Sequence, residues 1–221
     1  MSAFLRDGRA RIGLALVGLL TLLALFAPLV VRHDPVAIDL AVALERPGAA
    51  HWLGTDVQGR DVWARLVHGA RVSLAVGVVS QVIALALGVA LGLVAGYYGR
   101  RVDDLVMRLA DVTLAFPTLL LLIAMAAALS PSLGTVIVTI GVVGWAGMAR
   151  LVRGQVLVVR EAEYVQAERA LGAGDARILL RHVLPNVVAP VVIAATLGVA
   201  GVFYIRARSS LGDQTRTGCS A

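Results

Sequence analysis

The residue types that catalysis and metal binding require are few in this sequence, and they are scattered along it. Three glycines, Gly54, Gly59 and Gly69, do not form the GxxxxGK loop that holds nucleotide phosphates, and no Ser-His-Asp cluster occurs. Four histidines share no metal-ligand spacing, and each is expected to be a surface residue: His33, His51, His68 and His182. We therefore predict no catalytic, cofactor or metal site, and any ATP must bind to a partner subunit.

A row of small residues suits a different task, the close packing of two helices. Small side chains occur at every fourth position of one apolar stretch: Ser80, Ala84, Gly88, Gly92 and Gly96. In membrane helices this spacing lets two backbones approach each other on one face. The alternative is that such residues are simply common in a chain with 23 glycines. A second group, Gly141, Gly144 and Gly147, predicts another close contact, and Trp145 beside it is expected at a membrane–water interface.

The segment at residues 153–185 is too polar to cross a membrane, and it predicts two short helices joined by a glycine turn. The first helix is expected over residues 161–171, with Gly172 at its C-cap. Three of its residues share one face at helical spacing: Tyr164, Ala167 and Leu171.

The second short helix is expected over residues 176–184, with Asp175 as its N-cap. Pro185 and Pro190 should then bend the entry to the next apolar stretch. A solvated loop is the plainest alternative for the whole segment. A DNA-binding helix-turn-helix fits poorly, because membrane spans tether the segment at both ends.

Membrane helices must position these residues. The chain has 221 residues, of which 59% are hydrophobic and only 15% are charged, against about 25% in soluble domains. Uncharged stretches of the length that a bilayer needs divide, with a turn at residues 130–134, into five predicted spans: 12–31, 72–99, 112–129, 135–152 and 183–205. The predicted fold class is an all-α membrane protein, a polytopic helical bundle of about five transmembrane helices. The predicted parts are an anchor helix with an external loop (1–68), a transmembrane domain (69–205) and a polar tail (206–221).

Charge predicts the orientation. The net charge is +6, and most of the arginines lie before the first span, around residues 100–108 and over 150–181. The positive-inside rule therefore predicts a cytoplasmic N-terminus and a cytoplasmic loop at 153–185. The first span is expected to stay as an anchor, the alternative being a cleaved signal peptide. No charged residue lies in the middle of a span, which argues against an ion-coupled transporter.

Two groups of residues carry a resemblance to a known family. Residues 163–173 followed by 181–186 resemble the EAA loop of bacterial ABC importer permeases. The family triplet Glu-Ala-Ala is here Gln166-Ala167-Glu168, whereas Gly172 and the pair Leu184-Pro185 match the pattern. Further segments resemble the C-type subunit of the dipeptide/oligopeptide permeases: 51–56, 59–62, 69–74 and 96–99.

The resemblance implies the type-1 ABC importer fold and a permease that hydrolyses nothing itself. It implies a second permease subunit, two cytoplasmic ATPase subunits and an extracytoplasmic substrate-binding protein as partners in a bacterial inner membrane, and no nucleic acid. The loop helix would dock into a groove on an ATPase subunit. The residues expected in that contact are Tyr164, Ala167, Glu168, Ala170, Leu171, Gly172, Ala173 and Asp175.

Family members of this type have a sixth span, and the resemblance ends near Gly201. A frameshift or truncation with a missing sixth helix is therefore expected. Three alternatives to an importer permease stay open: an ion-coupled secondary transporter, a membrane scaffold, and a permease that the shortened end makes non-functional.

Overall fold

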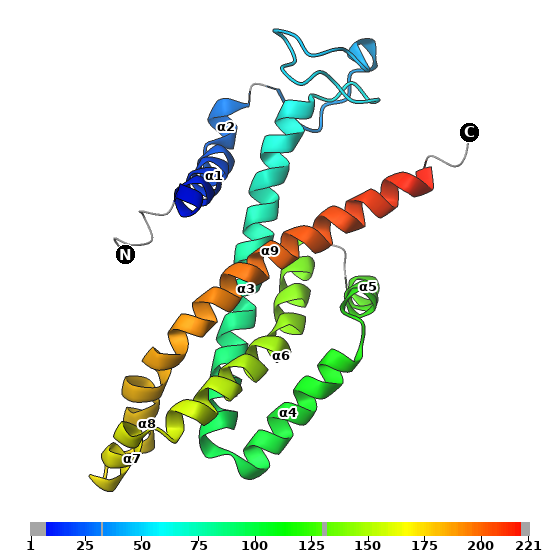
Figure 1. The fold of residues 1–221 in the computed structure, drawn as a ribbon. Coiled ribbons are helices and arrows are strands. Elements are labelled where there is room, and N and C mark those ends of the chain that lie inside the picture. Colours follow the sequence, from blue (N-terminus) through cyan, green and yellow to red (C-terminus); the bar gives the residue numbers. More distant parts are fainter. Residues whose placement is uncertain (1–7, 32, 130–131, 218–221) are drawn as a thin grey trace. The chain divides into compact units, whose positions relative to one another are not determined.

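The computed structural model describes residues 8–31, 33–129 and 132–217, and all regular secondary structure among them is helical. The chain divides into two compact units, Met1–Ala75 and Val76–Ala221 (Figure 1). The elements follow each other as α1 (Gly8–Leu25), α2 (Ala27–Val30), η2 (Leu40–Val42), α3 (Val62–Tyr98), α4 (Arg100–Ala115), α5 (Thr118–Ala128), α6 (Leu133–Arg160), α7 (Glu163–Ala170), α8 (Asp175–Ile178), η3 (Leu179–Val183) and α9 (Leu184–Thr217).

In the first unit, the long loop before α3 is ordered by its own polar side chains. The Thr55 hydroxyl donates to the Val42 carbonyl and accepts from the Glu45 N–H at 2.8 Å. Gly59 has a φ of 72°, and a Cβ there would lie 1.6 Å from the Asp39 carbonyl oxygen, so only glycine fits. The loop is therefore a defined structure, built from residues that carry the family resemblance.

Asp56 organises the turn that leads into α3. Its carboxylate accepts the backbone N–H groups of Gln58 at 2.8 Å and Arg60 at 3.0 Å, and the Arg60 side chain at 2.9 Å. Burial favours the neutral acid, but these hydrogen bonds outweigh it and lower the pKa of Asp56 from 3.8 to about 2. The stabilisation from this carboxylate is therefore present above pH 3.8 and is lost as the pH falls towards 2.

Helix α3 begins ten residues before the apolar stretch that predicts a span at 72–99. The cause is Asp61, whose side chain accepts the Ala64 N–H at 2.8 Å and caps the helix in polar sequence. The helix ends at Tyr98, and the following Gly99 has a φ of 62°. Among the described residues, three helical stretches are long and apolar enough to cross a membrane: Val62–Tyr98, Leu133–Arg160 and Asp175–Val199.

The predicted span at residues 112–129 is not one helix. Phe116 is extended, with φ −87° and ψ 134°, so α4 ends at Ala115 and α5 has only 11 residues. The reason is Pro117, whose ring disfavours the helical conformation of the residue before it. The apolar helix of the first predicted span, Arg11–Leu25, is also shorter than the three long stretches.

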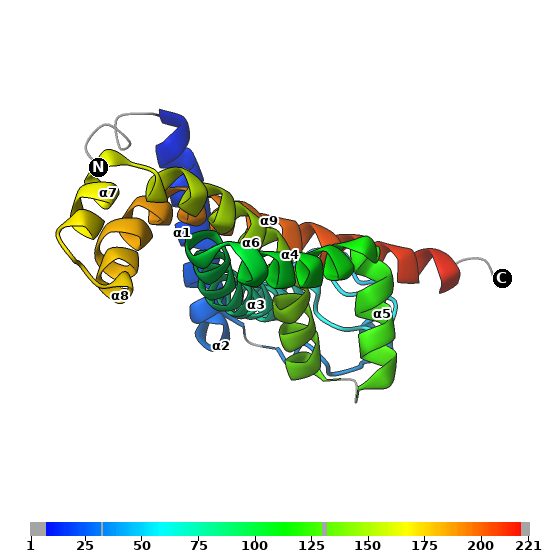
Figure 2. The ribbon, with the colours of Figure 1, turned by 90° about the horizontal axis from the view of Figure 1, so that it is seen from below.

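In the second unit, α6 packs against α4, α5 and α9, and these helices lie around it in two views (Figures 1 and 2). One hydrophobic core runs from α3 and α6 through α7, α8 and η3 into α9. Its buried members are Tyr97, Met148, Val152, Val156, Val165, Ile178, Val183, Val187 and Val191. The predicted polar loop is therefore joined to the helices by a shared core.

The helix is not interrupted at Pro185, so the second short helix does not end at residue 184 as predicted. Helix α8 continues through the π-helical turn η3 directly into α9. The π turn precedes Pro185, where the missing N–H and the ring disturb the normal helical hydrogen bonding. The predicted polar tail at 206–221 begins as helix, since the α9 backbone reaches Thr217, and residues 218–221 lie outside the described part.

Candidate helix-packing site and coupling loop

The small residues of α3 lie against α6. A Cβ built on Gly88 would lie 2.5 Å from the Met148 Cβ, and one on Gly92 would lie 2.6 Å from the Ala149 carbonyl oxygen. At Gly96 the added atom would lie 2.7 Å from the Val156 Cβ. No side chain fits at these contacts unless the two helices separate, so the spacing of the glycines sets the distance between the helices.

Nearer the N-terminus of α3, the glycines of the contact belong to α6. Ser80 is buried, and its hydroxyl donates to the Val76 carbonyl at 2.6 Å, so this polar group is satisfied within its own helix. A Cβ on Gly141 of α6 would lie 3.0 Å from the Ser80 carbonyl oxygen, and one on Gly144 would lie 3.1 Å from the Ala84 Cβ. The two glycines of α6 thus pack directly against the small residues of α3.

Two expectations for α6 are wrong. Gly147 has no atom within 4 Å of an added Cβ, so it takes no part in the close contact. Trp145 is 6% exposed and packs with Ala110, Ala146 and Ala149, so it is a core residue and not part of an outward-facing aromatic belt. Its hydrophobic area is buried against alanines whose small side chains leave room for the indole ring.

Ion pairs fix α4 to α6. The Arg153 guanidinium donates to both Asp103 carboxylate oxygens, with Nε–Oδ1 at 2.5 Å, and Arg150 donates to Asp111. Sequence reasoning missed these pairs. A sequence signal for them was the spacing of three residues between the arginines, which places both on one side of α6.

The loop after α6 has a rigid glycine turn. Helix α7 begins two residues after its predicted start and ends one residue before its predicted end. The Gly172 N–H donates to the Arg169 carbonyl at 3.0 Å and the Ala173 N–H to the Glu168 carbonyl at 3.1 Å, which is a Schellman motif. Gly172 has the left-handed φ of 81° that this motif requires.

Asp175 is not the N-cap of the second short helix. Gly174 takes that position with extended backbone, and Asp175 is the first residue of α8. The Asp175 carboxylate instead accepts a 2.7 Å hydrogen bond from the Tyr97 hydroxyl at the end of α3. The Arg169 guanidinium lies 5.5 Å from the centre of the Tyr97 ring, so this tyrosine contacts both loop helices.

The loop divides its apolar residues between an inner and an outer side. Val165 and Ile178 are fully buried in the shared core. Tyr164 is 45% exposed and Leu171 is 84% exposed. Ala167 and Ala170 are also exposed, and Ala173 is half-buried. The Glu168 Oε1 atom lies 3.7 Å from the His182 Nε2. The loop therefore has one apolar side buried in the core and another that is exposed.

The second unit also contains a cavity of about 380 Å³ between α3, α4, α5, α6 and α9. Its lining is mainly apolar, and its polar side chains are those of Ser80, Gln81 and Thr113. Hydropathy alone does not predict the cavity. It depends on the break at Phe116, which Pro117 causes and which lets α5 lie beside α6. A cavity of this kind between helices is a usual place for a small ligand.

Long apolar helices that pack through glycines, with no strand among the described residues, define an all-helical membrane protein. Residues 88–204 match the model of the binding-protein-dependent transport system inner membrane component. Residues 1–47 match the N-terminal transmembrane domain of oligopeptide transport permease C. The chain belongs to this family of membrane transport permeases.

Relatives at 39–44% identity are named as peptide permeases. The dipeptide transport system permease protein DppC of Alkalihalophilus pseudofirmus is 44% identical, over 86% of this chain and 62% of its own length. The oligopeptide transport system permease protein OppC of Bacillus subtilis is 39% identical, over 94% and 68%. The probable D,D-dipeptide transport system permease protein DdpC of Escherichia coli is 40% identical, over 87% and 64%. The chain thus spans about two thirds of the length of these relatives.

Proposed function

We propose that this chain is a permease subunit of an ATP-driven importer and forms part of the pathway for di- or oligopeptides. The names of the relatives support the substrate class. Its proposed partners are a second permease subunit, two cytoplasmic ATPase subunits and an extracytoplasmic substrate-binding protein. The family description and the bacterial relatives support an inner membrane location. The arginine distribution supports an orientation with the N-terminus and α7–α8 in the cytoplasm.

The observation that carries the proposal is the anchored loop with its exposed apolar side. Val165 and Ile178 tie α7 and α8 to the helical core, while Tyr164 and Leu171 face away from it. In the proposed mechanism this outer side seats on an ATPase subunit. A displacement of the ATPase then moves α3 and α6 through the hydrogen bond from Tyr97 to Asp175 and through the shared core. The chain itself carries out no hydrolysis.

The test is a charge placed on the exposed side. Leu171→Asp would introduce a carboxylate at a position that is 84% exposed, so the permease should fold normally. Val36→Asp is the matched control, because Val36 is 72% exposed and lies in the loop of the first unit. We expect Leu171→Asp to reduce co-purification of the ATPase subunits about tenfold or more, as for a central contact residue. Equal recovery with both variants would remove the coupling role of α7.

A further inference from the structure

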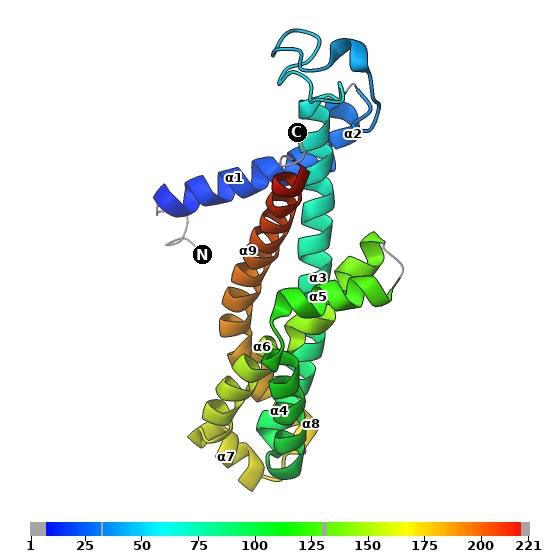
Figure 3. The same ribbon diagram turned by 90° about the vertical axis from the view of Figure 1, so that its right-hand side faces the viewer.

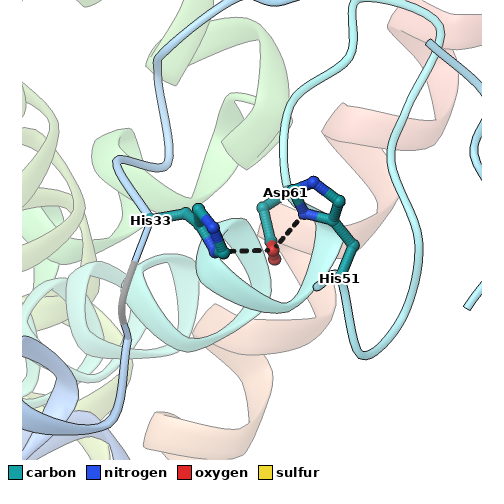
Figure 4. Close-up of side chains that lie close together, drawn as sticks. All are labelled: His33, His51 and Asp61. Carbon is teal, nitrogen blue, oxygen red and sulfur yellow. Dashed lines mark hydrogen bonds and ion pairs between the residues drawn. The ribbon is translucent and has the colours of Figure 1, made fainter. Parts of the chain in front are cut away.

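Two histidines and an aspartate meet at the start of α3, in the first unit (Figure 4). The Asp61 Oδ2 atom lies 2.8 Å from the His51 Nδ1 and 3.3 Å from the His33 Nδ1. One ligand atom from each residue lies within 4.8 Å of the other two. His33 follows α2, His51 lies in the long loop and Asp61 caps α3, so three separate segments converge.

The expectation of a surface histidine holds for His33, which is exposed, but is wrong for His51. His51 is only 14% exposed, and its ring centre lies 4.8 Å from that of His33. Asp61, between them, is 5% exposed. The residues were not grouped from the sequence because their separation matches no metal motif. The loop fold, set by Thr55 and Gly59, brings them together.

A cavity of about 220 Å³ adjoins two of the three side chains, those of His33 and Asp61, and it is also lined by Trp52 and Trp63. The Trp63 indole nitrogen is buried and, among the described residues, has no hydrogen-bond acceptor. A buried N–H without a partner is costly and rare in folded proteins. An acceptor inside the cavity, such as a metal-bound water or anion, would satisfy it.

We propose that His33, His51 and Asp61 bind a divalent transition-metal ion of the zinc class, with an exchangeable ligand on the cavity side. Two imidazoles and one carboxylate suit Zn²⁺ and its neighbours, whereas Mg²⁺ and Ca²⁺ prefer oxygen ligands alone. Three protein ligands leave one position of a tetrahedral site open. The ion links the segment after α2 and the loop to the start of α3.

The site does not depend on the peptide-import proposal, and zinc is the probe that tests it. The full-length chain is purified in detergent, stripped with a chelator, desalted and titrated with Zn²⁺ by calorimetry, and bound zinc is counted by elemental analysis. We expect one zinc per chain. Loading with Co²⁺ in place of zinc should give the visible absorption of a four-coordinate site.

Two variants remove ligands while keeping the fold. His33→Ala acts at a side chain that is 47% exposed. Asp61→Asn keeps an oxygen for the Ala64 N–H, because asparagine caps helices as well as aspartate does. Both should weaken zinc binding at least tenfold. The matched control is His68→Ala, since the His68 Nδ1 lies 3.2 Å from the Ala64 carbonyl and outside the cluster.

Two results would contradict the proposed zinc site. A wild-type chain that retains no stoichiometric zinc, or equal binding by His33→Ala, Asp61→Asn and His68→Ala, would overturn the site and leave a hydrogen-bonded histidine–aspartate network. In that case zinc would not change the melting temperature of the wild type. Because zinc is measured on the permease alone, this failure is distinguishable from a failure of ATPase coupling.

Discussion

Gly172 shows what one residue contributes to the loop. Its φ of 81° is left-handed, and no atom lies within 4 Å of an added Cβ. A Cβ there would meet no neighbour, so the main cost of a substitution is backbone strain, about 1–2 kcal/mol for an ordinary residue. A substitution at Gly172 therefore tests the geometry of the turn without changing the packing around Cβ.

We expect Gly172→Leu to lower the recovery of ATPase subunits without unfolding the membrane helices, because the strained turn misplaces Leu171. Gly172→Asn is the matched control, since asparagine adopts the left-handed conformation more readily. Co-purification and the melting temperature of the detergent-solubilised permease are measured together. Equal ATPase recovery with leucine and asparagine would argue against a role for the turn.

Tyr97 is the second residue whose change has a defined result. Tyr97→Phe keeps the ring beside Arg169 and removes the hydroxyl that donates to Asp175. A hydrogen bond of this kind contributes about 0.5–1.5 kcal/mol. We expect limited proteolysis between α7 and α8 to become severalfold faster. Tyr98→Phe, at the exposed neighbouring ring, should leave the cleavage rate unchanged.

At the residue scale, sequence patterns predict what depends on local geometry. The turn at Gly172 follows from its place after a helical repeat, and the small ridge of α3 follows from its spacing. The roles of Asp175 and Asp61 could not be predicted, because each is set by a partner distant in sequence: Tyr97 for Asp175 and two histidines for Asp61. Local capping rules say nothing of such partners.

At the scale of elements, the contact between α3 and α6 makes a matched pair of substitutions available. Gly92→Ala would place a Cβ 2.6 Å from the Ala149 carbonyl oxygen, whereas Gly147→Ala meets no atom within 4 Å. Both replace glycine by alanine in a helix, so their propensity effects are alike. We expect Gly92→Ala to destabilise the protein by about 1–3 kcal/mol through overpacking.

Thermal unfolding in detergent, followed by circular dichroism, measures this difference. Gly147→Ala should unfold at the wild-type temperature or slightly above it. If Gly92→Ala unfolds at that same temperature, the two helices are not held at the distance that the glycines set.

Apolar length predicts the three longest helices well. It locates the cores of α3, α6 and α9, although each helix extends beyond its apolar part. It fails at residues 112–129, because a hydropathy window does not register the effect of Pro117 on Phe116. It also misses the early start of α3, which depends on the cap supplied by Asp61.

At the scale of the whole molecule, the arginine distribution predicts which segments face the cytoplasm. Ala170→Cys and Val36→Cys, each in a Cys219→Ser background, place single thiols at exposed positions. An impermeant maleimide added to intact cells should label Val36→Cys and leave Ala170→Cys unlabelled. The reverse pattern would invert the topology and exclude ATPase docking at α7.

The core that α7 and α8 share with α6 and α9 has a mechanical consequence. Val165 and Ile178 belong to the same buried cluster as Val152 and Val187, so the base of the loop is packed against α6 and α9. Helix α7 lies at the end of α6 (Figure 3). Close-packed interiors have low compressibility and transmit strain. A loop packed in this way should bend little when it is displaced. A partner that pushes on Leu171 would therefore do its work on the inner ends of the membrane helices.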